Sequence, residues 1–310
     1  MQAQDPRGAR LAVRARTEGL SVVDVDRALT EERSLLITWL NRGTLHLVRS
    51  EDYLWLHALT TPPLLTSNSR RLRQEGVTES AAERGEKVIE KALTEEGPLT
   101  RPQLRERLDA ADVPTGGQAL VHLLFLATLR GFAVRGPMVG KEHAYVLVRD
   151  WLGEQRPVER EQALAELARR YLRGHAPADD RDLGRWAGLP LRDARAGLTA
   201  ISKQLVERED GLLELKDSPP PEPLPPPRLL GPFDPVLLGW TSREEIVGPH
   251  KMLVTDNGIF RPFAMVEGRA VATWRLAGGK LTIEHLGEVK KKDAAALEAD
   301  AARVLEFLGA

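Results

Sequence analysis

One order of elements, short helices followed by a strand or a hairpin, recurs three times before residue 218 and restricts the fold more than any other feature. Recurrence at this spacing predicts tandem copies of one small unit, and helix, helix, helix, strand is the order of a winged helix. We place the three units at residues 1–75, 76–155 and 156–217. The predicted fold class is α+β and mainly helical, with three winged-helix units in tandem.

The first unit opens with a helix signal at Asp5-Pro6. Aspartate can cap free backbone amides, and proline at the first helical position loses no hydrogen bond. Helical spacing and Gly19 as a stop predict helices over residues 6–17 and 22–29, with residues 33–40 as the third helix. A strand is then expected over 44–48 and helical spacing over 51–59.

The second and third units repeat this order with clearer wings. Helices are predicted over residues 81–93, 100–108 and 117–129, and a hairpin joins 132–135 to 144–148 around Gly136-Pro137 and Gly140. In the third unit, helices are predicted over 159–172, 180–186 and 191–205, followed by a wing over 206–215 that turns at Asp210-Gly211. The helix over residues 119–126 is almost wholly apolar, so we expect it to lie in a core.

A proline-rich stretch, residues 218–227, separates these units from the rest, because proline disfavours both helix and sheet pairing. We define residues 218–230 as the connector and 231–310 as a C-terminal, β-rich portion. Short strands are expected near 237–238, 252–255, 259–265, 270–275 and 281–284, with turns at Asn257-Gly258, Glu267-Gly268 and Gly278-Gly279. Residues 291–307 are predicted to form a closing amphipathic helix.

Composition excludes several classes of function. The 310 residues contain 44 Lys and Arg against 45 Asp and Glu, so the net charge of -1 gives no whole-molecule attraction to a polyanion. The absence of Cys excludes disulfides and thiolate sites and, with no signal peptide, indicates the cytoplasm. The sequence contains no run of about 20 apolar residues, so no membrane span is predicted. Aromatic content of 5% argues against a platform for stacking single-stranded bases.

Tandem winged helices make duplex DNA the first partner to consider, although winged helices that bind proteins are common. Arg192, Arg195 and Lys203 could reach phosphates from the third unit, and Arg70, Arg71 and Arg73 form a local basic cluster. Alternatively, these basic residues are solvated surface side chains of an arginine-rich protein and have no role in binding DNA. Neither group forms a base-reading pattern, which favours recognition of DNA shape or backbone over an operator-specific repressor.

Five segments in the right order resemble the AlkZ-like winged-helix DNA glycosylases. They are Gln2-Ala3-Gln4-Asp5-Pro6-Arg7 and residues 38–48 (TWLNRGTLHLV), 97–100 (GPLT), 182–189 (DLGRWAGL) and 266–274 (VEGRAVATW). The resemblance covers nearly the whole chain. It implies a C-shaped scaffold with a concave basic surface for duplex DNA, and hydrolysis of the N-glycosidic bond of alkylated purines, including bulky adducts and interstrand crosslinks.

The same resemblance implies that Gln2 and Gln4 are the catalytic pair, since the family signature is Gln-x-Gln. An N7-alkylated purine is cationic and leaves without a general acid, so the enzyme must hold a water and stabilise an oxocarbenium-like sugar. A glutamine amide can orient that water but cannot take its proton. Asp5 is the nearest carboxylate, and we expect it to cap the first helix. Without the other segments, the pair would be interpreted as a frayed chain end.

Family members carry a further segment before the glutamine pair, whereas Met1 directly precedes Gln2 here. Either the start codon lies upstream or that segment is missing; the codons before Met1 would distinguish the two. The resemblance also predicts that a hairpin near Asp256-Asn257-Gly258 enters the DNA cleft, and the alternative is a surface hairpin. The DNA-binding candidates are Arg7, Arg42, Arg70, Arg71, Arg192, Arg195, His250, Lys251 and Asn257.

We therefore predict a monomeric, cytoplasmic, monofunctional DNA glycosylase that needs no cofactor, associates with the nucleoid when bound to DNA, and acts on alkylated purines in duplex DNA. No metal site is predicted, because the seven His residues show no paired spacing. Two alternatives remain: a non-enzymatic winged-helix regulator or damage-binding protein, and a scaffold that binds protein through its wings. Base release from alkylated DNA would support the enzyme. Binding whose affinity does not change with salt concentration would support the scaffold.

Overall fold

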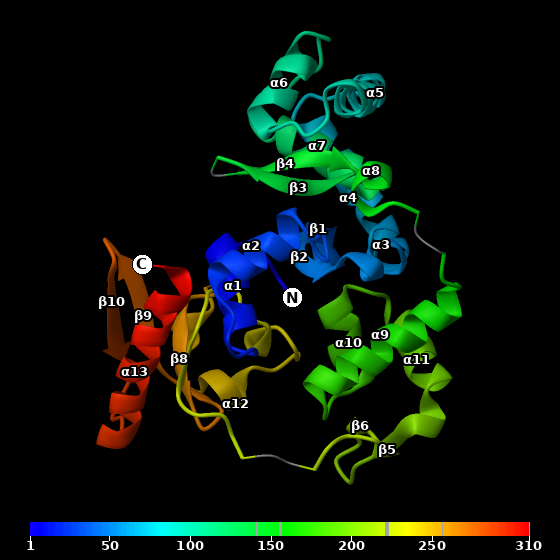
Figure 1. Cartoon of the computed structure of the whole chain (residues 1–310). Coiled ribbons are helices and arrows are strands. Elements are labelled where there is room, and N and C mark those ends of the chain that lie inside the picture. The colour runs from blue at the N-terminus through cyan, green and yellow to red at the C-terminus, as the bar shows by residue number, and fades with distance from the viewer. Residues whose placement is uncertain (141, 155–156, 221–222, 256, 310) are drawn as a thin grey trace. The chain divides into compact units, whose positions relative to one another are not determined.

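The computed structural model describes residues 1–140, 142–154, 157–220, 223–255 and 257–309 (Figure 1). Contacts between Cα atoms divide the chain into two compact units. The first unit combines Met1–Asp26 with Leu164–Ala310, and the second is the continuous segment Arg27–Ala163. These units do not coincide with the five predicted segments, whose boundaries stay predictions.

The second unit consists of helices and an antiparallel sheet with strand order β2-β1-β3-β4. Its helix α7 is its core, as predicted: Leu120, Leu123 and Leu124 are at most 1% exposed and pack with residues of α5 and α6. The elements are β1 (Leu35–Leu40), β2 (Thr44–Arg49), α3 (Tyr53–Thr60), α4 (Pro62–Gln74), α5 (Glu79–Glu96), α6 (Arg101–Asp109), α7 (Ala119–Leu129), β3 (Ala133–Val139), β4 (Glu142–Leu147) and α8 (Val148–Leu152).

The predicted third helix over residues 33–40 is wrong, because this segment is strand β1. Strand β1 pairs with β2 on one side, where Leu36 lies opposite Val48, and with β3 on the other, where Ile37 lies opposite Arg135. Leu36, Ile37 and Leu40 are all buried. A strand buried on both faces loses its polar alternation, so its apolar run cannot be told from a helix by periodicity.

The first unit contains helices and an antiparallel sheet with strand order β10-β9-β8-β7, and α13 contacts β7. A separate two-stranded ladder, β5 with β6, forms the predicted wing of residues 206–215. The elements are α1 (Pro6–Arg14), α2 (Val22–Thr30, which crosses the unit boundary), α9 (Arg160–His175, which also crosses it), α10 (Asp180–Ala187), α11 (Leu191–Ala200), β5 (Leu205–Glu207), β6 (Leu213–Leu215), β7 (Arg228–Leu230), α12 (Glu244–Val247), β8 (Phe263–Val266), β9 (Arg269–Ala277), β10 (Lys280–His285) and α13 (Lys291–Leu308).

Two of the C-terminal turns form as predicted. Glu267 and Gly268 have φ values of 49° and 79°, and Gly278 and Gly279 have 55° and 74°. Positive φ at both central residues is the signature of the tight turns whose twist matches antiparallel strands, so these residues connect β8 to β9 and β9 to β10.

The strands predicted near residues 237–238 and 252–255 are wrong. The first is the 3₁₀ turn η4 (Pro235–Leu237), because the side chain of Asp234 accepts the amide of Val236 and Pro235 suits a helical start. The second is the 3₁₀ turn η5 (Lys251–Leu253). Within the described ranges, no helix is both long and apolar enough to cross a bilayer. Because both units combine helices with an antiparallel sheet, the fold class is α+β, as predicted.

Candidate active site

The glutamine pair directly precedes α1, and the start of that helix fixes where the pair lies. Asp5 has extended backbone angles, and its Oδ1 accepts the amide of Gly8 at 2.5 Å. Pro6 occupies the first helical position. The predicted capping role of Asp5 is confirmed, so this carboxylate is engaged with the backbone of α1.

Gln2 and Gln4 lie side chain to side chain. Gln2 Nε2 donates to Gln4 Oε1 at 2.7 Å. Gln2 is 7% exposed, whereas Gln4 is exposed and Ala3 between them is buried. Gln2 Oε1 is buried and has no hydrogen-bond partner among the described residues. A buried carbonyl oxygen without a partner is costly, and such an atom is well suited to accept a hydrogen from a water.

Helix α1 is tied to the C-terminal part of the first unit by arginines that face buried carboxylates. Arg14 donates from Nη1 to Asp300 Oδ2 at 2.9 Å and from Nη2 to Asp300 Oδ1 at 2.5 Å. Arg16 makes a second two-point contact with Asp234, at 3.0 and 2.7 Å. Asp300 is 2% exposed and Asp234 is fully buried. Paired donors of this kind set both distance and orientation.

The charge state of Asp300 follows from these contacts. Burial acts to raise the pKa of its carboxyl, but hydrogen bonds from Arg14 and from the amide of Leu229 bring the pKa below its ordinary value. The Leu229 amide lies 2.8 Å from Asp300 Oδ2. Asp300 is therefore ionised at neutral pH and joins α1, β7 and α13 through one side chain.

Neither Asp300 nor Asp234 was singled out from the sequence. A signal existed for Asp300, because it shares the inward face of α13 with Leu297, Ala301 and Val304, which are all buried. An acidic residue on an apolar helix face requires a buried cation. Its partner Arg14 is 286 positions away, and no local pattern connects the two.

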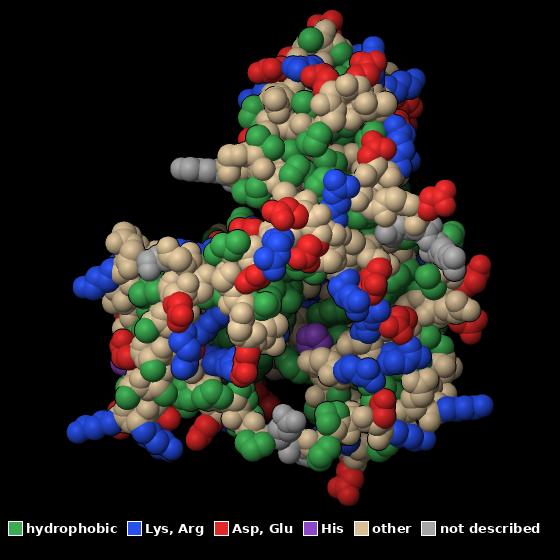
Figure 2. Space-filling view, in the orientation of Figure 1, with side chains coloured by type: hydrophobic (Ala, Val, Ile, Leu, Met, Phe, Trp, Pro, Cys, Tyr) green, Lys and Arg blue, Asp and Glu red, His purple; other side chains and the backbone are tan. Residues whose placement is uncertain are grey.

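The predicted DNA-binding residues of the first unit lie at its surface with different partners. Arg7 is exposed on the first turn of α1 and makes no hydrogen bond or ion pair with the described residues. Arg192 is 85% exposed and lies 3.8 Å from Asp193, and Arg195 Nε donates to Asp180 at 2.6 Å. Lys and Arg side chains gather over α9 and α10 on the face that Figure 2 shows.

The segment predicted as a DNA-entering hairpin is a turn next to η5. Val254 and Phe260 form an isolated bridge, and the Thr255 amide donates to the Ile259 carbonyl at 2.9 Å. Thr255 Oγ1 donates to Asn257 Oδ1. Lys251 and Asn257 are exposed, and His250 is half-buried. Asp256 lies outside the described residues.

The remaining candidates belong to the second unit. Arg42 is exposed, with φ of 57°, in the turn between β1 and β2. Arg70 and Arg71 are exposed on α4, where Arg71 contacts Gln74 at 2.8 Å and Glu75 at 3.3 Å. Among the described residues, no three His, Asp or Glu side chains gather as a metal site would require.

Comparison with known proteins identifies the family. The family described as "DNA glycosylase AlkZ-like" matches residues 1–307. The chain belongs to the AlkZ-like DNA glycosylases. This membership confirms the predicted resemblance and the prediction of an enzyme of the DNA glycosylase class.

A curated relative and a solved structure agree with the family. The chain is 28% identical over 343 aligned positions to an interstrand DNA cross-link repair glycosylase of Streptomyces sahachiroi, covering 100% of this chain and 88% of that protein. It is also similar to the solved structure of the Streptomyces sahachiroi DNA glycosylase AlkZ, with a TM-score of 0.81 at 25% identity, over 100% of this chain and 88% of that one. The α+β fold of this AlkZ-like glycosylase is thus shared with a solved family member.

Proposed function

We propose that this protein is a monofunctional glycosylase that hydrolyses the N-glycosidic bond of alkylated purines in duplex DNA, with a water oriented by Gln2 and Gln4. The observation that carries the proposal is the buried Gln2 Oε1, which has no partner among the residues that the structure describes, in a glutamine pair joined at 2.7 Å. The inter-amide bond restricts Gln2, so its free oxygen keeps one direction. A water bound there would keep its own lone pairs available for the sugar.

The chemistry needs little more than this orientation. N7 alkylation makes the purine a cationic leaving group, so departure requires no general acid. Holding the water close to C1′ replaces an unfavourable encounter by a pre-aligned one, and amide dipoles stabilise charge that develops on the sugar. The nearby carboxylate of Asp5 accepts the Gly8 amide and caps α1, which leaves orientation rather than proton abstraction as the role of this site.

We further propose that the chain acts as a cytoplasmic, nucleoid-associated monomer with three winged-helix units at residues 1–75, 76–155 and 156–217, a connector at 218–230 and a β-rich portion at 231–310. Contacts to the phosphate backbone of DNA would come from a set of basic and polar side chains at the surface. The set is Arg7, Arg42, Arg70, Arg71, Arg192, Arg195, His250, Lys251 and Asn257. Their contacts should weaken as salt rises, because phosphate binding releases counterions.

The direct test is release of the damaged base. A duplex that carries N7-methylguanine is incubated with the protein, and abasic sites are read as strand breaks after mild alkaline treatment. We expect release by the wild type, and a fall of about 10²-fold or more in Gln2→Ala and Gln4→Ala, the size seen when one oriented polar group is removed from an active site. Gln162→Ala, an exposed glutamine on α9, is the matched control. Unchanged release in both site variants would refute the assignment.

The direction of the inter-amide bond gives a sharper test. Gln4 accepts and Gln2 donates, so Gln4→Glu keeps an acceptor at position 4, whereas Gln2→Glu removes the donor and sets two acceptors against each other. We expect Gln4→Glu to retain more activity than Gln2→Glu. The reverse order would show that the pair is used with its amides exchanged.

The substrate range is tested in parallel. The curated relative is named as an interstrand cross-link repair glycosylase. We therefore propose that bulky N7 adducts and crosslinked guanines are accepted as well as N7-methylguanine. Single-turnover rates on a methylated duplex and on a crosslinked duplex of the same sequence decide this. Release from the methylated duplex alone would limit the enzyme to small adducts.

A further inference from the structure

Helix α1 contacts the C-terminal part of the first unit near its start and at its end. Near its start, Gly8 lies against the segment Gly231-Pro232, where a Cβ added to Gly8 would come within 2.4 Å of the Pro232 carbonyl oxygen. At its end, Arg14 and Arg16 bind Asp300 and Asp234.

The helix end has a further contact, since Arg228 donates to the carbonyl of Ala15, the residue that closes α1. A cation at a helix C-terminus is favourable because it meets unpaired carbonyls. Contacts at both ends of one short helix fix its rotation and its position along its axis.

Such fixing matters because the glutamine pair is only two to four residues from the helix. A rotation of α1 by about 15° would move a Cα atom at its radius of about 2.3 Å by roughly 0.6 Å. Catalytic groups must be held to within about 0.5 Å, so this movement would exceed the tolerance. The Arg14–Asp300 contact, with donors on both oxygens of one carboxylate, resists such a rotation.

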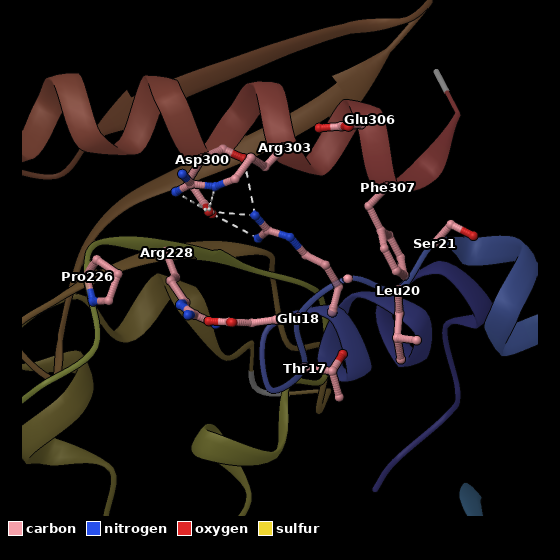
Figure 3. Close-up of a pocket in the computed structure, with 12 residues that line it drawn as sticks. Thr17, Glu18, Leu20, Ser21, Pro226, Arg228, Asp300, Arg303, Glu306 and Phe307 are labelled. Atoms are coloured by element: carbon pink, nitrogen blue, oxygen red, sulfur yellow. Dashed lines mark hydrogen bonds and ion pairs between the residues drawn. The ribbon is translucent and has the colours of Figure 1, made fainter. Parts of the chain in front are cut away.

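The Arg14–Asp300 pair borders a cavity of about 600 Å³, which is also lined by Thr17 and Glu18 and by Pro226 of the connector. Figure 3 shows Asp300 and Arg303 reaching from α13 toward this space, with Arg303 on the same carboxylate. The arginines that line the cavity are offset by Glu18, Asp300 and Glu306, so the charges do not select an anion or a cation. The cavity instead gives small solutes access to the pair.

We propose that Asp300 and Asp234 are positioning residues, which hold α1 in the one rotation and register that aligns Gln2 and Gln4 for base release. The inference rests on the proposed function, since it assigns these aspartates a role in that site. They do not touch the reacting atoms. They act through Arg14 and Arg16, and the close approach of Gly8 to Gly231 seats the start of the helix.

The experiment separates alignment from binding. Asp300→Asn weakens one charge contact, and Gly8→Ala leaves every charge in place but forces the start of α1 away from Pro232. For each variant we would measure single-turnover base release from the N7-methylguanine duplex, the Kd for that duplex, and hydrogen exchange of the α1 amides. We expect release to slow about 10- to 100-fold, as small misplacements do, with Kd within about threefold and faster exchange in α1.

Matched controls exist for both substitutions. Asp217→Asn removes a carboxylate that contacts Arg173 at 3.1 Å on the surface, and Gly174→Ala adds a methyl group where nothing lies within 4 Å. Both controls should release base at the wild-type rate. If Asp300→Asn does not fold, Asp300→Glu and Asp234→Asn take its place. Formate added to Asp300→Ala should restore part of the rate through the cavity, and chloride should not.

The outcomes are distinguishable. Wild-type rates and wild-type exchange in Asp300→Asn and Gly8→Ala would overturn the positioning role while leaving the proposed function intact. A parallel loss of DNA binding would also overturn it, because it would show a general structural role. If the wild type releases no base, the proposed function fails, and exchange of the α1 amides alone then decides whether these residues hold the helix.

Discussion

The unit Arg27–Ala163 is one continuous stretch of chain, whereas the unit that carries the glutamine pair joins Met1–Asp26 to Leu164–Ala310. The continuous unit has a large apolar core around α7, and its ion pairs Arg107–Glu96 and Arg149–Glu90 lie at the surface. The discontinuous unit joins its distant segments through buried carboxylates at Asp234 and Asp300. Apolar packing is non-directional, while a two-point ion pair fixes an angle. Fixed angles between distant segments are thus found in the unit that carries the glutamine pair.

The largest expected effect lies in the continuous unit Arg27–Ala163, the apolar unit of this comparison. Leu124→Ala should lower the free energy of unfolding of this unit by about 3–5 kcal/mol, because a fully buried leucine side chain leaves a cavity. Hydrogen exchange of the α5 and α7 amides in increasing urea measures this. Val158→Ala, at an exposed position, is the control. A loss below about 1 kcal/mol would mean that the core of this unit repacks easily.

Next in size is the buried ion pair of the other unit. Arg14→Met keeps most of the aliphatic stem but leaves Asp300 with fewer partners, and we expect a loss of about 3 kcal/mol in the first unit. Exchange of amides in α1, β7 and α13 should report it, while α5 and α7 keep their protection. Arg173→Met removes an exposed partner of Asp217 and serves as control. An equal increase of amide exchange in both units would show that the ion pair does not act on the first unit alone.

A smaller effect is expected from pH in the apolar unit. Burial lowers the pKa of His57 below its ordinary value, against a hydrogen bond to the Thr128 carbonyl that acts to raise it. His57 therefore contributes stability that is complete above the unfolded pKa of about 6.5 and is lost as pH falls toward the lower folded pKa. His57 alone should lower the free energy of unfolding of the wild type between pH 7 and pH 5 by at most about 1.4 kcal/mol per pH unit. In His57→Gln the decline should become smaller by this amount, and a decline should remain because burial also lowers the pKa values of His46 and His122 in this unit.

The smallest effect is expected from a surface ion pair of the apolar unit. Arg149 lies 3.3 Å from Glu90, with about half of each side chain exposed. Arg149→Ala should cost at most about 1 kcal/mol, and the difference should shrink as salt is added, because exposed charges are screened. Urea unfolding at two salt concentrations checks this. A loss as large as that of Arg14→Met would remove the distinction between the two kinds of pair.

Local signals in the sequence predicted most helices but not the pairing of distant segments. Caps and amphipathic spacing predicted α1, α5, α6 and α10, because these signals lie within a few residues of one another. Strand β1 was predicted as a helix, since its character depends on neighbours in β2 and β3. Helix α4, which begins at Pro62, was not predicted.

The candidate site shows the same limit. The Gln2–Gln4 pair came from a short motif and a family resemblance, and Asp5 from its position before Pro6. The Arg14–Asp300 and Arg16–Asp234 pairs required the fold, because they join residues 286 and 218 positions apart. A sequence can show that a buried aspartate needs a cation, but the arginine that meets it is decided by topology.

The ionic tie between α1 and α13 also bears on how the enzyme is made. A ribosome completes Arg14 long before Asp300, so during synthesis the glutamine pair precedes the aspartates that we propose hold it in register. On that proposal, catalytic competence would arrive with the last helix rather than with the first. A nascent chain interrupted before α13 would lack Asp300, the carboxylate that Arg14 contacts at the end of α1.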